Sequence, residues 1–189
     1  MAAVMMGFSI SLDGFIASAE REDAGLHDWL FAGDRPIEVA GTEFMTDSAQ
    51  SAAVFRETVA AIGAVIVGRT AYGDGGDEAY FDLPTFVLTR RQPPAEHHPK
   101  VTYVREGIVR ALELATATAG DKQVNVFGGA STAQQYLAAG LIDELRLTVV
   151  PIFLGDGLRL FGPDTPRRAA EMVASVATPT VTHLHLRFA

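Results

Sequence analysis

The segment from residue 124 to residue 132 constrains the fold of this chain more than any other. Residues 124–127 are mostly apolar and include two β-branched valines, which predicts a buried strand, and residues 130–137 predict a helix. Gly128 and Gly129 join the two. Such a junction is typical of α/β proteins, and it leaves backbone N–H groups unpaired at the positive end of the helix dipole. The segment predicts either an anion site suited to phosphate or an ordinary connection with a capped helix.

The rest of the chain alternates patterns of strand and helix. Short apolar runs predict strands at 4–11, 64–67, 85–89, 101–104 and 145–151, and apolar residues at helical spacing predict helices at 48–62 and 107–119. Segments 169–177 and 180–188 predict an antiparallel hairpin. Segment 15–47 has many breaks and predicts a long loop with a helical turn near 27–31. We expect one α/β domain over residues 1–189: a mixed, mostly parallel sheet flanked by helices, closing with the antiparallel hairpin.

Composition excludes several classes of protein. The 189 residues suffice for one domain with its own core. The net charge of −8 argues against a general nucleic-acid binder, which would carry a basic face. The chain has no cysteine, so disulfide and thiolate chemistry are excluded. No apolar run approaches the length of a membrane span, and no secretory leader is recognisable, so we expect a cytoplasmic protein without a membrane partner.

Basic residues follow two of the predicted strands. Gly68, Arg69 and Thr70 come directly after one strand, and Thr89 and Arg90 follow the next. Because parallel strands end at one edge of a sheet, these side chains should gather beside the two glycines. Arginine pairs well with phosphate, although a single loop arginine is more often only solvated. Together the strand ends predict a ligand with several phosphates.

Six motifs in order carry a resemblance to a known family. They are SLDGFIA at 11–17, VGRTAY at 67–72, VLTR at 87–90, GGAS at 128–131, DELRL at 143–147 and PIFLGDGLRLF at 151–161. The chain resembles the dihydrofolate reductase-like superfamily, in the branch that holds the reductase domain of the bacterial riboflavin-biosynthesis deaminase-reductase. The resemblance covers nearly the whole chain.

The resemblance implies NADPH bound across the strand ends of a twisted mixed sheet. It assigns Gly68, Arg69 and Thr70 to the region of the adenosine 2′-phosphate, and Thr89 and Arg90 to the adenosine end. The pyrophosphate would lie on the glycine pair and the helix start, which comprise Gly128, Gly129, Ala130, Ser131 and Thr132. The family also leads us to expect a cis peptide between the two glycines.

Candidate catalytic and substrate residues lie near the N-terminus. Asp13 follows the first strand, where the nicotinamide should lie, and is a candidate proton relay or substrate contact; the alternative is a simple Asp-Gly turn. Asp28 and Trp29 resemble a family position near the substrate, and Trp29 would either stack on a flat heterocycle or fill the core. Phe15 is a second candidate substrate contact. Helix 48–62 lacks a recognisable acidic motif, which weighs against dihydrofolate as substrate.

We therefore expect an NADPH-dependent reductase of a small flat heterocycle, of pyrimidine or pteridine type, that acts on a C=N or carbonyl group. The resemblance implies an activity like that of 5-amino-6-(5-phosphoribosylamino)uracil reductase, the enzyme of riboflavin biosynthesis in this branch of the family. The alternative is a non-catalytic nucleotide-binding relative. The apolar C-terminal strands and segment 158–161 offer a homodimer surface, but a core role explains the same residues.

Two sets of residues in the sequence are candidate metal ligands, and we expect a metal at neither. Asp74, Asp77, Glu78 and Asp82 form an acidic segment whose spacing matches no calcium loop and suits a solvated face better. His183 and His185 alternate on the last strand and share a face, but the sequence offers no third ligand for zinc.

Overall fold

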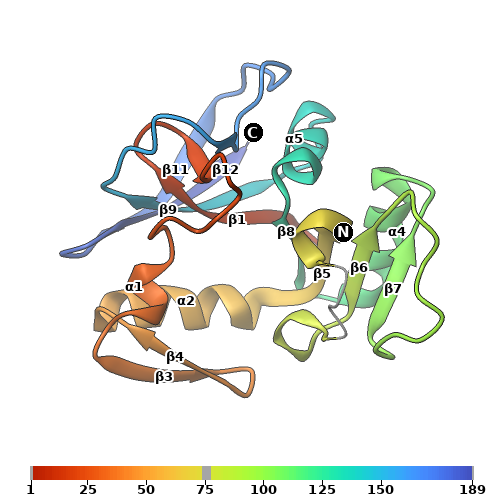
Figure 1. Cartoon of the computed structure of the whole chain (residues 1–189), viewed down its shortest axis with the longest axis horizontal. Helices are drawn as coiled ribbons and strands as arrows, with labels where there is room; N and C mark the ends of the chain where they lie inside the picture. The colour runs from red at the N-terminus through yellow and green to blue at the C-terminus, as the bar shows by residue number, and fades with distance from the viewer. Residues whose placement is uncertain (1, 74–77, 189) are drawn as a thin grey trace.

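The computed structural model describes residues 2–73 and 78–188, and an eight-stranded sheet forms its centre (Figure 1). In spatial order the strands are β11 (Ala170–Ala177), β12 (Thr182–Phe188), β9 (Glu144–Val150), β1 (Val4–Ser11), β8 (Gln123–Gly128), β5 (Ile62–Gly68), β6 (Thr85–Leu88) and β7 (Val101–Val104). All neighbours from β9 to β7 pair in parallel, whereas β11 and β12 are antiparallel. The predicted mostly parallel sheet with an antiparallel C-terminal hairpin is confirmed.

Helices α4 (Ile108–Ala119) and α5 (Ala130–Ala138) cover one face of the sheet. Alternate residues of β1, such as Met6 and Ile10, point into this main core. Tyr136 of α5 is fully buried, and its hydroxyl donates a hydrogen bond of 2.8 Å to the carbonyl of Ile108 in α4. This bond fixes α5, whose first residue follows the glycine pair.

Helix α2 (Ala49–Ala61) lies on the opposite side of the sheet (Figure 1). Its start at Ser48 follows the sequence prediction, because the Ser48 hydroxyl accepts a hydrogen bond of 3.0 Å from the backbone N–H of Ser51. The strand residues beneath it include Gly7 and Ser9, which alternate with the core residues of β1. Polar and small residues therefore face α2, and this layer holds the cavity described below.

Segment 15–47 contains more structure than the sequence predicts. The helical turn is confirmed as α1 (Asp28–Phe31), but the rest is not a plain loop, because β3 (Arg35–Val39) and β4 (Thr42–Thr46) form a hairpin. Its Ile37, Val39 and Phe44 are buried in a second core. A short strand β2 (Phe15–Ala17) pairs with β10 (Leu158–Arg159), which the sequence also did not predict.

Short helical segments connect β5 to β6. They are α3 (Arg69–Tyr72) and the 3-10 turn η1 (Tyr80–Asp82). Asp74 and Asp77, which the sequence placed in an acidic segment, lie outside the described residues. Among the helices described, none is long and apolar enough to cross a membrane.

Candidate active site

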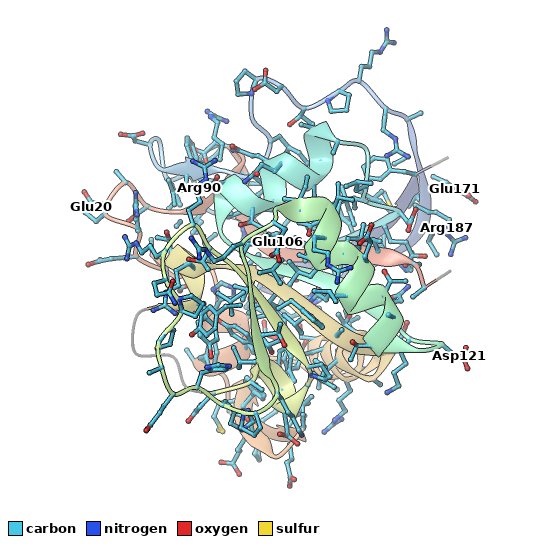
Figure 2. The ribbon with its side chains drawn as sticks, turned by 90° about the vertical axis from the view of Figure 1, so that its right-hand side faces the viewer. Glu20, Arg90, Glu106, Asp121, Glu171 and Arg187 are labelled. Carbon is cyan, nitrogen blue, oxygen red and sulfur yellow. The ribbon has the colours of Figure 1, made fainter. Side chains whose placement is uncertain are left out.

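The carboxyl ends of β5, β6, β7 and β8 lie at one edge of the sheet. Figure 2 shows Arg90, which follows β6, on one side of the molecule and Asp121, which precedes β8, on the other. A cavity of about 2070 Å³ opens at this edge and continues between the sheet and α2. Because a small-molecule pocket is typically about 300–1,000 Å³, this space can hold a dinucleotide and a second ligand together.

Every residue predicted to bind the cofactor lines this cavity. They are Gly68, Arg69, Thr70, Thr89, Arg90, Gly128, Gly129, Ala130, Ser131 and Thr132. The residues come from strand ends far apart in the sequence, and the parallel pairing of the strands brings them together.

The glycine pair forms the start of α5. No side chain caps this helix, so its first N–H groups are available to a ligand. Gly129 has φ of 83°, a conformation that favours glycine. The expected cis peptide is absent: no described residue has one, and the chain turns through the positive φ of Gly129 instead. Gly68 faces the pair, and a Cβ at Gly68 would overlap the hydroxyl of Thr132.

Arginines surround this helix start. The guanidinium of Arg69 donates a hydrogen bond of 2.8 Å to the hydroxyl of Tyr103, and its Cζ atom lies 5.2 Å from the ring centroid. Arg90 is exposed at the end of β6. Arg105, which the sequence analysis did not name, follows β7 and also lines the cavity. The strand-end rule that identified Arg69 and Arg90 would have found it.

These residues fit a ligand that carries phosphates at two places. The uncapped N-terminus of α5 suits one anion, because its N–H groups and dipole converge there. The arginines after β5, β6 and β7 suit another, because guanidinium groups pair with phosphate oxygens. A dinucleotide with a further phosphate on its adenosine, such as NADPH, meets both requirements.

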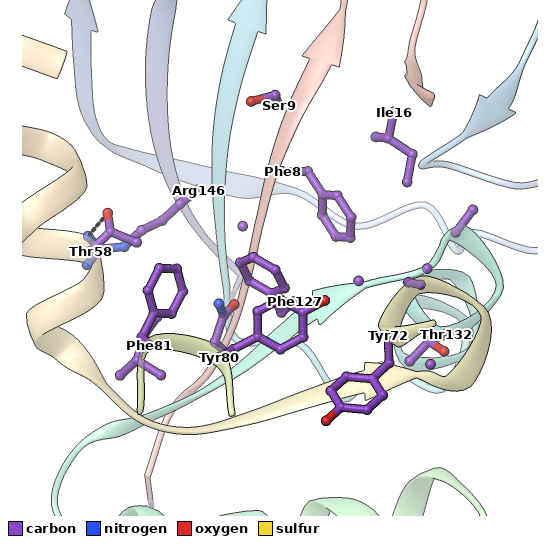
Figure 3. Close-up of a pocket in the computed structure, with 18 of the residues that line it drawn as sticks. Phe8, Ser9, Ile16, Thr58, Tyr72, Tyr80, Phe81, Phe127, Thr132 and Arg146 are labelled. Carbon is purple, nitrogen blue, oxygen red and sulfur yellow. Dashed lines mark hydrogen bonds between the residues drawn. The ribbon is translucent and has the colours of Figure 1, made fainter. Parts of the chain in front are cut away.

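Aromatic side chains line the other end of the cavity (Figure 3). Tyr80 and Phe127 have ring centroids 4.6 Å apart, and Phe81 lies 5.6 Å from Phe127. Phe81 has φ of 53°, which is strained for a bulky residue, and such strain is concentrated at functional sites. These rings give a ligand at this end an apolar wall.

The position of Trp29 is compatible with both alternatives that the sequence left open. Its side chain is buried and packs in the second core, yet it also lines the cavity. The indole Nε1–H donates a hydrogen bond of 3.0 Å to the hydroxyl of Ser9. Its ring lies edge-on to His183, with centroids 5.0 Å apart. The indole is thus fixed in place and offers only part of its surface to a ligand.

The floor of this end carries polar groups without partners. Asn125 is 3% exposed, and its Oδ1 atom accepts no hydrogen bond in the described structure. Arg146 donates from Nη1 to the hydroxyl of Thr58 at 3.0 Å (Figure 3). It also lies 3.7 Å from Glu57, but its Nε–H is buried without a partner in the described structure. A buried polar group left unpaired costs about 1–3 kcal/mol, so these atoms indicate a ligand site.

His183 lies on the same floor between two hydroxyl groups. Its ring nitrogens lie 3.0 Å from the hydroxyl of Ser51 and 2.9 Å from that of Thr148. Burial lowers the pKa of His183, although the nearby carboxylate of Asp47 acts in the opposite direction. His185 contacts Glu144 at 2.9 Å. The described residues contain no group of three side chains that could hold a metal.

The remaining predicted site residues lie elsewhere. Asp13 accepts hydrogen bonds from the Ser11 hydroxyl and from the backbone N–H groups of Leu154 and Gly155, which lowers its pKa to about 2. Asp28 is exposed at the start of α1. Phe15 is buried, with the guanidinium of Arg159 4.2 Å from its ring centroid. The described lining of the cavity includes none of the predicted residues Asp13, Asp28 and Phe15.

Comparisons with known proteins agree with this architecture. The chain is 29% identical over 157 residues to YwjB, an uncharacterized protein of Bacillus subtilis (strain 168), which covers 81% of this chain and 79% of YwjB. The structure of a protein from Shewanella sp. PV-4 matches with a TM-score of 0.72 and 22% identity, over 99% of both chains.

A second solved structure shares the fold. The Thermotoga maritima diaminohydroxyphosphoribosylaminopyrimidine deaminase/5-amino-6-(5-phosphoribosylamino)uracil reductase matches all of this chain with a TM-score of 0.66 and 15% identity. This chain spans only 57% of the length of that protein. Residues 79–184 match the family described as the RibD C-terminal domain. The dihydrofolate reductase-like resemblance noted from the sequence is thereby confirmed, and the chain belongs to the RibD C-terminal domain family.

Proposed function

We propose that this chain is an NADPH-dependent oxidoreductase that reduces a C=N or carbonyl group of a small planar heterocycle. One observation carries the proposal: the uncapped start of α5 and the arginines after the neighbouring strands line the same cavity. Membership of the RibD C-terminal domain family supports it, because a structural neighbour is a uracil-derivative reductase. NADPH would supply a hydride.

The residues of this chain would bind and orient the reactants. The N–H groups at the start of α5 would hold the pyrophosphate, and Arg69 would contact the 2′-phosphate. Thr89 and Arg90 would hold the adenosine end. The aromatic end of the cavity, beyond the glycine pair, would exclude water from the substrate.

Calorimetric titration with NADPH and NADH tests the cofactor assignment. We expect NADPH to bind more tightly than NADH. We expect Arg69→Ala to lower the affinity for NADPH by about tenfold and to change the affinity for NADH little, because only NADPH carries the 2′-phosphate. Arg110→Ala removes the same charge from an exposed Arg110–Glu113 pair outside the cavity and serves as the control. Equal losses for both cofactors in Arg69→Ala would remove the role of Arg69, and no binding of either cofactor would overturn the proposal.

A second function, nucleotide binding without catalysis, is favoured by one observation. Both predicted acidic catalytic residues, Asp13 and Asp28, lie outside the cavity. If the chain only binds nucleotide, NADPH will bind but will not be oxidised in the presence of pyrimidine or pteridine substrates. Absorbance at the nicotinamide band, followed across such a panel, separates the two functions.

A further inference from the structure

The unpaired polar atoms on the cavity floor indicate what kind of molecule the aromatic end binds. Asn125 on β8 and Arg146 on β9 flank β1, and register places Met5 opposite Asn125 and Gly7 opposite Arg146. Because side chains alternate along a strand, Asn125, Arg146 and the Gly7 position face the same side of the sheet. All of them line the cavity.

Gly7 leaves room between the two side chains. A Cβ atom at Gly7 would lie 3.9 Å from Asn125 Oδ1 and 3.9 Å from the carbonyl oxygen of Arg146. Gly7 itself therefore places no side chain in the space beside the Asn125 amide. The amide is 3% exposed and its Oδ1 lacks a partner, so this space ends at a polar group that the protein itself does not satisfy.

The chemistry of these groups matches one kind of ligand edge. A primary amide presents one carbonyl acceptor and N–H donors side by side, whichever way the side chain is turned. A lactam ring presents the complementary pair, because its N–H and C=O are adjacent and point the same way. The buried Nε–H of Arg146 adds a donor for a second carbonyl.

The electrostatics of this end disfavour a phosphate. The guanidinium of Arg146 lies 3.7 Å from the carboxylate of Glu57, so the positive charge of Arg146 already has a carboxylate partner. Phe127, Tyr80 and Phe81 add an apolar wall. Arg69, Arg90 and Arg105 belong to the opposite end, at the strand edge. An uncharged planar ring therefore suits this end better than a phosphorylated sugar.

We propose that Asn125 and Arg146, with the open space at Gly7 between them, recognise the lactam edge of an uncharged planar heterocycle. This inference rests on the proposed function, since it names the substrate class of the same cavity. It assigns Asn125 and Arg146 as determinants of specificity.

Calorimetric binding of two probes to the full chain tests this proposal. The probes are lumazine, a bicyclic ring with lactam groups, and quinoxaline, a bicyclic diazine of similar shape without them. We expect lumazine to bind at least about tenfold more tightly than quinoxaline, because only lumazine pairs with the buried polar atoms. Equal affinity of the two probes, or no binding of lumazine, would overturn the proposal.

Variants show whether Asn125 and Arg146 themselves discriminate. Gly7→Ala adds a methyl group at ordinary contact distance, so the fold should tolerate it. The variant should lower the affinity for lumazine by about tenfold and change the affinity for quinoxaline little. Asn125→Leu and Arg146→Lys should likewise reduce the preference for lumazine over quinoxaline. Equal losses of affinity for lumazine and quinoxaline would show that these residues have only a structural role, and would contradict the proposal.

A parallel titration with NADPH separates this inference from the proposed function. The variants at Gly7, Asn125 and Arg146 should keep their NADPH affinity, because the nucleotide groups lie at the strand edge. If lumazine binds selectively but NADPH does not bind, the lactam site stands and the reductase fails. If NADPH binds and lumazine shows no preference over quinoxaline, the reductase stands and the lactam site fails.

Discussion

At the scale of single residues, Asp13 shows how a candidate catalytic group can acquire another role. Its carboxylate accepts hydrogen bonds from Ser11 Oγ, Leu154 N and Gly155 N at 2.6, 3.2 and 2.7 Å. These bonds join the end of β1 to the segment after β9. They favour the ionised form, so at neutral pH Asp13 is a poor proton donor.

We predict that Asp13→Asn lowers stability at neutral pH and that the difference shrinks on acidification. The hydrogen bonds lower the pKa of Asp13 from 3.8 to about 2, so the folded state favours the carboxylate. Its contribution is therefore complete above pH 4 and is lost as pH falls toward 2. Urea unfolding at pH 7 and at pH 3 measures the difference between wild type and variant.

Asp28→Asn is the control for this prediction, because Asp28 is an exposed residue at the start of α1. It should change stability much less than Asp13→Asn. An Asp13→Asn variant with unchanged stability at pH 7 would contradict the structural role. If that variant also lost turnover, the catalytic role inferred from the sequence would be restored.

The sequence analysis placed together those residues whose location follows from position on the chain. Arg69, Arg90 and the Gly128–Gly129 pair lie at or just after strand ends, so one rule about parallel sheets places them at one edge. Asn125 and Arg146 lie within strands and look like ordinary polar residues in a row of apolar ones. Their meaning depends on which strands are neighbours, and the order β9-β1-β8 is not evident from a single sequence.

At the scale of elements, the β3–β4 hairpin shows why segment 15–47 was predicted as a loop. Its buried residues alternate, with Ile37 and Val39 on one strand and Phe44 and Thr46 on the other, but Pro36 precedes the first pair and Glu38 separates its two members. The turn uses Ala40 at φ of 52° and Gly41 at φ of 77°. Ala-Gly is not among the common turn pairs such as Asn-Gly, so the hairpin signal was weak.

The contact between the end of β5 and the start of α5 supports a second prediction. Gly68→Ala would bring a Cβ atom into overlap with Thr132 Oγ1, and Thr132 is buried. We expect Gly68→Ala to destabilise the protein by about 1–3 kcal/mol, as overpacking typically does, and to lower its affinity for NADPH. Denaturant unfolding and calorimetric titration measure the two effects.

A double variant tests the cause. In Gly68→Ala/Thr132→Ala the overlapping hydroxyl is gone, so most of the lost stability should return, and NADPH affinity should return to the level of Thr132→Ala alone. Thr132→Ala alone is the matched control. Purely additive losses in the double variant would show that Gly68 is required for another reason than its contact with Thr132.

At the scale of the whole molecule, the parallel sheet explains the division of the cavity. Parallel pairing from β9 to β7 gathers backbone and arginine groups at one edge, where we propose that the cofactor phosphates bind. Beneath α2, the same strands present side chains from their middle, where we propose that a planar ring binds. The groups at the strand edge can therefore be located from the order of strands along the chain. The groups beneath α2 can be located only from the register of side chains across neighbouring strands.

The homodimer expected from the sequence concerns the outer edge of the sheet. Strand β11 ends the sheet and is exposed along most of its length, with Met172 53% and Val173 40% exposed. Segment 158–161 exposes less apolar surface than a dimer interface there would need, because Leu160 is fully buried in the main core and only Phe161 is appreciably exposed among its apolar residues. An exposed apolar edge strand favours pairing with a second copy.

We predict that the chain is a dimer and that Val173→Lys shifts it to monomer, because a charge on the edge strand opposes pairing of two sheets. Gel filtration with light scattering measures the mass. Val109→Lys on α4 is the matched control: Val109 is 60% exposed but lies away from the edge, so this variant should remain dimeric. A monomeric wild-type chain would contradict the prediction, and dissociation of both variants would show that added charge, rather than the β11 edge, is responsible.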